Sequence, residues 1–146
     1  MGHASQIALT IALQHPEQRI WCLDGDGAVL MHMGGMAIIA NSEANNLVHV
    51  VLNNGAHDSV GGQPTVGLSI DIAKIASAMG YKQTYTLTSN TELTKVLNQI
   101  KEASGPILIN ILVRKGNRPD LGRPTTTPIQ NKQAFMAQIL KTTDEA

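Results

Sequence analysis

The chain has 146 residues, 42% of them hydrophobic, and its 11 basic and 11 acidic residues give a formal net charge of zero. This length suits one domain with a single core. The balanced charge, without a basic run, argues against nucleic acid or an anionic membrane as a partner, and no apolar run approaches the ~20 residues of a membrane span. We therefore expect a small-molecule ligand. We also expect a cytoplasmic protein, because residues 1–14 lack the charged and apolar regions of a signal peptide.

The first half of the chain alternates helical and strand patterns. Apolar spacing predicts helices over residues 3–14 and 28–40 and strands over residues 19–23 and 47–52. Pro16 ends the first helix because proline disfavours a helical conformation in the preceding residue. The lone Cys22 lies inside the first strand and cannot form an internal disulfide, so it is interpreted as a small core residue.

The second half repeats the alternation after a polar, glycine-rich loop at residues 53–67. Gly80 is a predicted left-handed helix end, and Ser89 or Asn90 is a predicted helix cap. Residues 114–128 are expected to be irregular. The remaining elements are predicted helices over residues 70–79, 90–103 and 130–140 and predicted strands over residues 82–87 and 106–113.

Strands that alternate with helices favour parallel pairing with right-handed crossovers. The sequence therefore predicts an α/β fold, a three-layer sandwich with a mostly parallel central sheet. We expect residues 1–146 to form a single domain. In such a sheet, ligands bind beyond the carboxyl ends of the strands.

Two turns follow predicted strands and carry groups suited to a phosphate and a metal. Gly25-Asp26-Gly27 allows close backbone approach and adds one carboxylate. The second turn, Asn53 to Ala56, follows after 25 intervening residues, a span that suits one helix and one strand, and it supplies amide oxygens. Carboxylate, amide, carbonyl and phosphate oxygens together suit octahedral Mg²⁺. Each turn alone is most often an ordinary turn, but their joint occurrence predicts a magnesium diphosphate site.

The paired turns resemble the cofactor motif of the thiamine-diphosphate enzymes, which is Gly-Asp-Gly followed by Asn-Asn after such an interval. The resemblance implies the thiamine-diphosphate-binding fold, with thiamine diphosphate and Mg²⁺ as cofactors. It implies that Asp26, the Asn54 side chain and the Ala56 carbonyl hold the metal. Main-chain groups of the Gly25 turn, at Gly27 and Ala28, would meet the diphosphate. Met1 would support the cofactor, since Met1-Gly2 resembles the end of a further family segment.

Within this family, the segment from Asn53 to Thr65 is most similar to that of the phosphonopyruvate decarboxylases, and the tail Asp120–Thr125 is similar too. This resemblance implies a carboxy-lyase that converts phosphonopyruvate, a 2-oxoacid, to phosphonoacetaldehyde and CO₂. His57 is the candidate catalytic residue, either binding the acidic group of the substrate or relaying a proton. A loop hydrogen bond is the structural interpretation of the same residue.

The resemblance also implies a missing half of the site. The family's activating Glu lies on a pyrimidine-binding domain, so we expect this chain to be a carboxyl-terminal fragment or one subunit of a two-domain enzyme. It would be inactive without that domain or subunit, in a homo- or hetero-oligomer.

Three alternatives stay open. Sulfopyruvate decarboxylase, whose halves can be separate subunits, differs only in the tetrahedral anion of its substrate. A noncatalytic cofactor-binding or assembly module would need Asp26 and Asn54 only as turn residues. Acetolactate synthases and oxoacid dehydrogenases share the metal motif but not the loop after it. Lys115, Arg118 and Arg123 could neutralise a phosphonate, although charged residues in a tail are more often solvated.

Overall fold

The computed structural model describes residues 1–141, in two compact units that divide after Gly116. The second unit contains α6 (Pro128–Lys141). No helix within residues 1–141 is both long and apolar enough to cross a membrane. The first unit holds the other elements, which are α1 (Ala4–Gln14), β1 (Ile20–Gly25), α2 (Asp26–Met31), α3 (Gly34–Ala40), β2 (Leu47–Asn53), the 3₁₀ turn η1 (Asp58–Val60), α4 (Ile72–Met79), β3 (Gln83–Leu87), α5 (Asn90–Gln99) and β4 (Ile107–Leu112).

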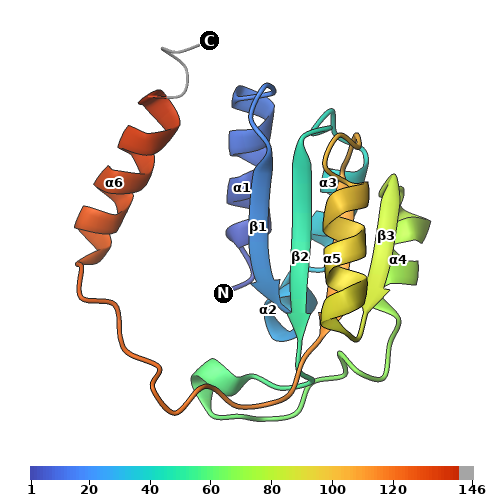
Figure 1. Ribbon diagram of the computed structural model, residues 1–146, viewed down its shortest axis with the longest axis vertical. Helices are drawn as coiled ribbons and strands as arrows, with labels where there is room; N and C mark the ends of the chain where they lie inside the picture. The colour runs from blue at the N-terminus through green and yellow to red at the C-terminus, as the bar shows by residue number, and fades with distance from the viewer. Residues whose placement is uncertain (142–146) are drawn as a thin grey trace. The chain divides into compact units, whose positions relative to one another are not determined.

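The sheet is parallel throughout, with the strand order β1-β2-β4-β3. Figure 1 shows β1, β2 and β3 pointing the same way, with the segment between β2 and α4 crossing beneath their arrowheads. The register of β1 and β2 places Cys22 beside His49 and Gly25 beside Leu52. The turns that follow β1 and β2 therefore leave the sheet at neighbouring positions.

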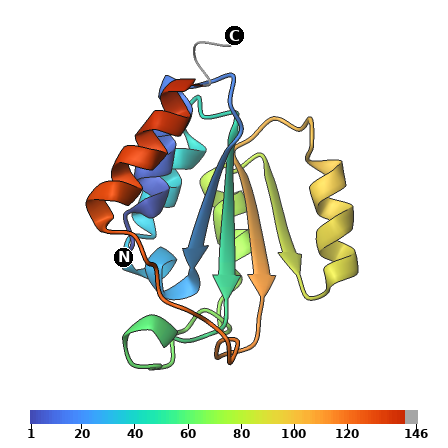
Figure 2. The same ribbon diagram turned by 60° about the vertical axis from the view of Figure 1, so that its left-hand side comes forward.

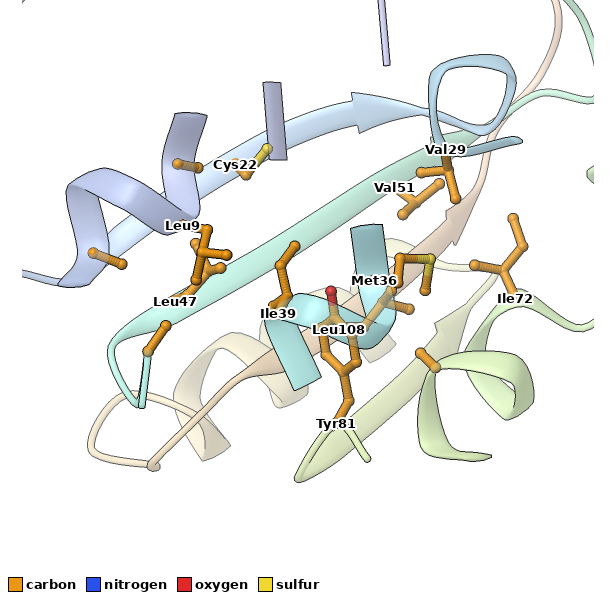
Figure 3. Packing of buried hydrophobic residues seen from close by; sticks show 14 of the residues in the cluster. Leu9, Cys22, Val29, Met36, Ile39, Leu47, Val51, Ile72, Tyr81 and Leu108 are labelled. Carbon is orange, nitrogen blue, oxygen red and sulfur yellow. The ribbon is translucent and has the colours of Figure 1, made fainter. Parts of the chain in front are cut away.

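Helices cover both faces of the sheet, as Figure 2 shows for α5 on one side and α1 and α3 on the other. The larger core cluster joins α1, α3 and α4 to one face, and its members include Leu9, Met36, Ile39 and Ile72. Figure 3 shows these residues packed around Cys22, Val51 and Leu108. A smaller cluster, with Val96 and Ile100, lies between α5 and the other face. This three-layer α/β arrangement is the predicted fold class.

The predicted helix over residues 28–40 is wrong in one respect, because the chain forms two helices, α2 and α3, separated by a turn at His32 and Met33. Backbone bonds over three residues, such as Gly35 N–H to the His32 carbonyl at 2.9 Å, replace the α-helical pattern there. Gly35 also lies against α1, where Gln6 Nε2 donates to its carbonyl at 3.1 Å. Similarly, α5 ends at Gln99 and not at residue 103, and η1 was not predicted.

Candidate cofactor and metal site

The two turns predicted to carry the chemistry meet at the carboxyl edge of the sheet. Asp26 begins α2 directly after β1, and Asn54 follows the last residue of β2. Asn54 N–H lies 3.4 Å from Asp26 Oδ1. A cleft of about 550 Å³ opens over these turns. All of the site residues predicted from the sequence line it: Met1, Gly25, Asp26, Gly27, Ala28, Asn54, Ala56 and His57.

Asp26 is only 1% exposed, so its carboxylate is almost entirely removed from water. Its two oxygens accept hydrogen bonds from the Asn54 N–H and the Thr65 hydroxyl, which are both neutral donors. Within residues 1–141, no cationic side chain forms an ion pair with it. A buried carboxylate without a countercharge is unfavourable, whereas a divalent cation beside it would remove the imbalance.

The two asparagines after β2 have different roles. Asn53 is fully buried and fixes the loop, because its Nδ2 donates to the Gly67 carbonyl at 2.7 Å and its Oδ1 accepts from the Gly55 N–H at 3.2 Å. Asn54 lines the cleft, and its Oδ1 accepts from the Ala56 N–H at 3.0 Å. An amide oxygen has two lone pairs, so Asn54 Oδ1 retains one for a metal.

Thr65 and Gly67 belong to this site, and the sequence analysis did not identify them. Gly67 N–H donates to Thr65 Oγ1 at 3.0 Å, which orients the hydroxyl that bonds Asp26. A Cβ at Gly67 would lie 2.5 Å from Asp26 Oδ2 and 2.8 Å from Asn53 Oδ1. Nothing in the local pattern distinguishes these two residues from other polar loop residues. Only the return of the loop to the sheet edge brings them to Asp26.

His57 faces the same cleft from the loop after β2. Its Nδ1 is buried and has no hydrogen-bond partner among residues 1–141. The imidazole packs so closely on Gly27 that a Cβ at that position would overlap the ring. The backbone of His57 is held by its N–H bond to the Gln63 carbonyl at 2.8 Å and by the Gly62 N–H at 2.9 Å. The ring therefore lines the cleft with its buried Nδ1 against Gly27, on a loop held by backbone hydrogen bonds.

The other predicted residues provide main chain or apolar surface. Gly27 and Ala28 are buried in the first turn of α2, and Gly25 has open space around its Cα. Met1 is 57% exposed and lines the cleft. Ala56 forms an isolated bridge with Pro64, which closes the loop that carries His57.

A second buried polar group lies beneath the cleft. Asp24 Oδ2 is 3.4 Å from His49 Nε2, although the pair is not aligned for a hydrogen bond, and His49 Nδ1 is 3.2 Å from the Tyr81 hydroxyl. In the sequence, His49 has no carboxylate or cysteine at metal-ligand spacing. The register of β1 and β2 nevertheless brings Cys22, Asp24 and His49 together, with ligand atoms within 4.8 Å of one another.

Cys22 in this group is a thiol and not a metal-binding thiolate. Burial, and then the charge of Asp24, raise the pKa of the Cys22 thiol to about 11. Metals bind the thiolate, which this environment disfavours. Cys22 therefore remains a core residue, as its sequence context predicts.

The cationic tail residues do not converge on the cleft. Lys115 Nζ donates to the Gly62 carbonyl at 2.5 Å, which ties the segment after β4 to the His57 loop. In the second unit, Arg118 pairs with Asp120 at 3.3 Å, and both side chains are largely exposed. Arg123 is exposed as well.

Comparison with known proteins places the chain in a family. The sequence pattern of the family described as "Thiamine pyrophosphate enzyme, C-terminal TPP binding domain" matches residues 1–111. The chain belongs to this family. Thiamine diphosphate is thus the cofactor type of the domain, as the paired turns predicted.

The relatives include named decarboxylases. Phosphonopyruvate decarboxylase from Streptomyces viridochromogenes is 39% identical over 95% of this chain, and that from Streptomyces hygroscopicus is 38% identical over 92%. The chain spans only 35% and 33% of those two proteins. Sulfopyruvate decarboxylase subunit beta from Methanothermobacter thermautotrophicus is 34% identical over 80% of this chain and 60% of its own length.

Solved structures share the fold. An enzyme described as thiamin diphosphate-dependent from Mycobacterium smegmatis superposes with a TM-score of 0.66 and 24% identity, covering 80% of this chain and 22% of its own. Transketolase from Campylobacter jejuni gives a TM-score of 0.54 at 19% identity, covering 76% of this chain and 19% of its own. At these identities the likeness establishes the fold alone.

Proposed function

We propose that this chain supplies the metal and diphosphate half of an active site that decarboxylates phosphonopyruvate to phosphonoacetaldehyde and CO₂, using thiamine diphosphate and Mg²⁺. The observation that carries the proposal is the convergence of Asp26, Asn54 and His57 on one cleft, in a chain 39% identical to a phosphonopyruvate decarboxylase. The substrate assignment is taken from those relatives. The roles of the residues are argued from their surroundings.

The metal would be held by Asp26, the Asn54 side chain and the Ala56 carbonyl. These ligands are all oxygens, which Mg²⁺ prefers to nitrogen or sulfur. The uncompensated carboxylate of Asp26 supports this role most directly, because burial without a cation costs free energy that Mg²⁺ would recover. Thr65 would keep the carboxylate in one orientation through its hydroxyl.

The diphosphate would lie against main-chain groups at Gly25, Gly27 and Ala28. Gly25 leaves open space, and Gly27 cannot carry a side chain without displacing His57. When bound, thiamine diphosphate supplies the ring that accepts the electron pair released as CO₂ leaves. Met1 contributes apolar surface at the cleft and would support the cofactor.

His57 would act on the substrate from the cleft wall. Its imidazole lines the cleft, where it would hydrogen-bond the acidic group of the substrate or hold a proton near the reacting carbon. Close packing on Gly27 places the ring beside the proposed diphosphate site. This position supports a role in substrate binding or proton transfer more than a role in folding the loop.

The active assembly would require a pyrimidine-binding domain, either on a separate subunit or on another part of the same polypeptide. The chain spans about a third of the phosphonopyruvate decarboxylases that it matches, and its M. thermautotrophicus relative is named as a subunit. These facts support a homo- or hetero-oligomer in which residues 1–146 form the diphosphate-binding domain. The chain alone should not turn over substrate.

The test is steady-state decarboxylation by the chain assembled with its pyrimidine-binding domain, in the presence of thiamine diphosphate and Mg²⁺. We expect turnover of phosphonopyruvate, and we expect Asp26→Ala to lower it by about a thousandfold because a charged metal ligand is lost. Glu17→Gln is the matched control, because Glu17 is an exposed carboxylate between α1 and β1. This variant should retain activity.

The same assay separates the alternatives. Preference for sulfopyruvate would replace the substrate and keep the site, an outcome favoured by the 34% identity to a sulfopyruvate decarboxylase subunit. If neither compound is turned over and Asp26→Ala leaves cofactor affinity unchanged, the chain is a noncatalytic module and the proposal is wrong.

A further inference from the structure

Asp24, His49 and Tyr81 form a buried polar group next to the proposed metal site. His49 is 1% exposed and Tyr81 is 5% exposed, while Asp24, at 9%, reaches the floor of the cleft. The contacts run from Asp24 Oδ2 to His49 Nε2 at 3.4 Å and from His49 Nδ1 to the Tyr81 hydroxyl at 3.2 Å. Figure 3 shows the Tyr81 ring with its hydroxyl oxygen directed into the core cluster.

Each residue of this polar group comes from a different segment of the protein. Asp24 lies on β1, two residues before Asp26. His49 lies on β2, whose end carries the asparagine turn. Tyr81 follows the left-handed Gly80 that ends α4, and α4 is entered from the loop that contains Thr65 and Gly67. These contacts therefore join β1 and β2, which lead to Asp26 and Asn54, to the residue that follows the end of α4.

One arrangement of protons fits the contacts of this polar group. Burial raises the pKa of the Tyr81 hydroxyl, so the hydroxyl keeps its proton and can donate it to His49 Nδ1. Nε2 then carries the imidazole proton on the side of the ring that faces the Asp24 carboxylate, although the two groups are not aligned for a hydrogen bond. In this arrangement Tyr81 fixes the tautomer of His49, and His49 packs against the carboxylate that immediately precedes the Gly25 turn.

We propose that Asp24, His49 and Tyr81 are positioning residues that set the relative placement of Asp26 and Asn54 for a divalent metal. The inference rests on the proposed function, since it concerns the same metal site. Polar partners behind metal ligands typically change metal affinity 10- to 100-fold when they are mutated. If this polar group only stabilised the core, mutation of its residues would change the unfolding midpoint and leave the metal affinity intact.

The deciding variant is Tyr81→Phe, which removes one hydroxyl and keeps the ring. The probe is Mn²⁺, which takes the same oxygen ligands as Mg²⁺ and is followed by electron paramagnetic resonance in the presence of thiamine diphosphate. We expect the Kd for Mn²⁺ to rise about tenfold. Tyr85→Phe is the matched control, because its hydroxyl bonds Gln83 at 2.7 Å and its ring packs on the α5 side of the sheet. That variant should bind Mn²⁺ like the wild type.

Two substitutions at His49 test whether metal affinity depends on the polar contacts of this residue. His49→Gln can still accept from Tyr81 and donate to Asp24, so it should retain more Mn²⁺ affinity than His49→Leu. Equal Mn²⁺ affinity in wild type and Tyr81→Phe overturns the inference even if His49→Leu does not fold. Asp26→Ala distinguishes a failure of this inference from a failure of the proposed function. If this variant binds Mn²⁺ like the wild type, or if the wild type does not bind Mn²⁺, the proposed metal site itself is wrong.

Discussion

Asp24 and Asp26 lie two residues apart and are both nearly inaccessible to water, yet their surroundings differ. Asp24 Oδ2 lies 3.4 Å from His49 Nε2, so this carboxylate faces a buried histidine of the neighbouring strand. Asp26 receives hydrogen bonds only from neutral donors in the part of the chain that the structure describes. The first carboxylate thus faces a side chain of the core, whereas the second is surrounded by donors of the turn after β2 and of the loop that follows it.

This difference distinguishes a carboxylate that faces the core from the one proposed to bind a metal. Both residues lie in the same short sequence, Asp24-Gly25-Asp26-Gly27, and neither its composition nor its spacing tells them apart. What distinguishes them is the neighbouring strand. His49 lies beside Cys22 in the register and reaches Asp24, while the segment after β2 places amide and hydroxyl donors around Asp26. Burial alone is therefore a poor guide to the role of a charge.

The largest expected effect tests the difference between Asp24 and Asp26 directly. Without metal, Asp24→Ala should lower the free energy of unfolding by about 3 kcal/mol, because the buried His49 Nε2 would face a cavity in place of a polar group. Asp26→Asn should change it by less than about 1 kcal/mol, because the amide oxygen still accepts a hydrogen bond and a buried charge is removed. Urea unfolding of both variants with a chelator present measures the difference. Equal losses would mean that the two carboxylates are equivalent and that Asp26 needs no external cation.

A smaller effect is expected at Gly67, which touches the ligand-binding carboxylate. In Gly67→Ala, the new methyl group would lie 2.5 Å from Asp26 Oδ2, so the loop must move, at a cost of about 2 kcal/mol. Calorimetry should also show weaker Mg²⁺ binding. Gly34→Ala is the control, since no atom lies within 4 Å of its added Cβ. If both variants bind Mg²⁺ alike, close packing at Gly67 does not shape the site.

Much of the fold follows from local pattern. The apolar strands, the alternation with helices and the left-handed Gly80 are all visible in the sequence, and the structure contains each of them. The break between α2 and α3 was missed although Gly34 and Gly35, which weaken a helix, begin α3, and Gln6 of α1 contacts Gly35 there. A sequence pattern predicts a helix or strand from its own residues and carries no information about the residues that pack against it.

The site divides in the same way. The motif turns, with Asp26 and Asn54, were found because they follow strands and carry oxygen ligands. Thr65 and Gly67 were missed because a loop returns them to Asp26 from 39 and 41 residues away. His49 gives no local signal either, because the carboxylate that it faces lies on another strand. Residues that contact the site through tertiary structure leave no local signal.

On the opposite side of the sheet, α5 offers a comparison in which stability should change without function. Ser89 and Glu92 form a capping box, with Glu92 N–H donating to Ser89 Oγ at 3.3 Å. Ser89→Ala should lower the free energy of unfolding by about 1 kcal/mol. Because α5 covers the face away from the cleft residues of α2, Mn²⁺ affinity should not change. A loss of affinity here would show that metal binding follows general stability, which would weaken the case for a specific positioning group.

The smallest expected effect concerns Cys22, the apolar neighbour of Asp24. Its folded pKa of about 11 lies above the ordinary value of 9.0, so the unfolded chain loses the thiol proton at lower pH than the folded one. The stability that this shift contributes is fully present below pH 9 and is lost as the pH rises from about 9 to about 11, with a change well under about 1 kcal/mol by pH 9. Cys22→Ala removes the thiol and leaves the lysine and tyrosine titrations common to both proteins. The wild type should therefore lose stability with pH more steeply than this variant in urea unfolding at pH 8, 9 and 10. Parallel curves would mean that the thiol titrates normally, and the apolar environment assigned to Cys22 beside the Asp24 carboxylate would then be wrong.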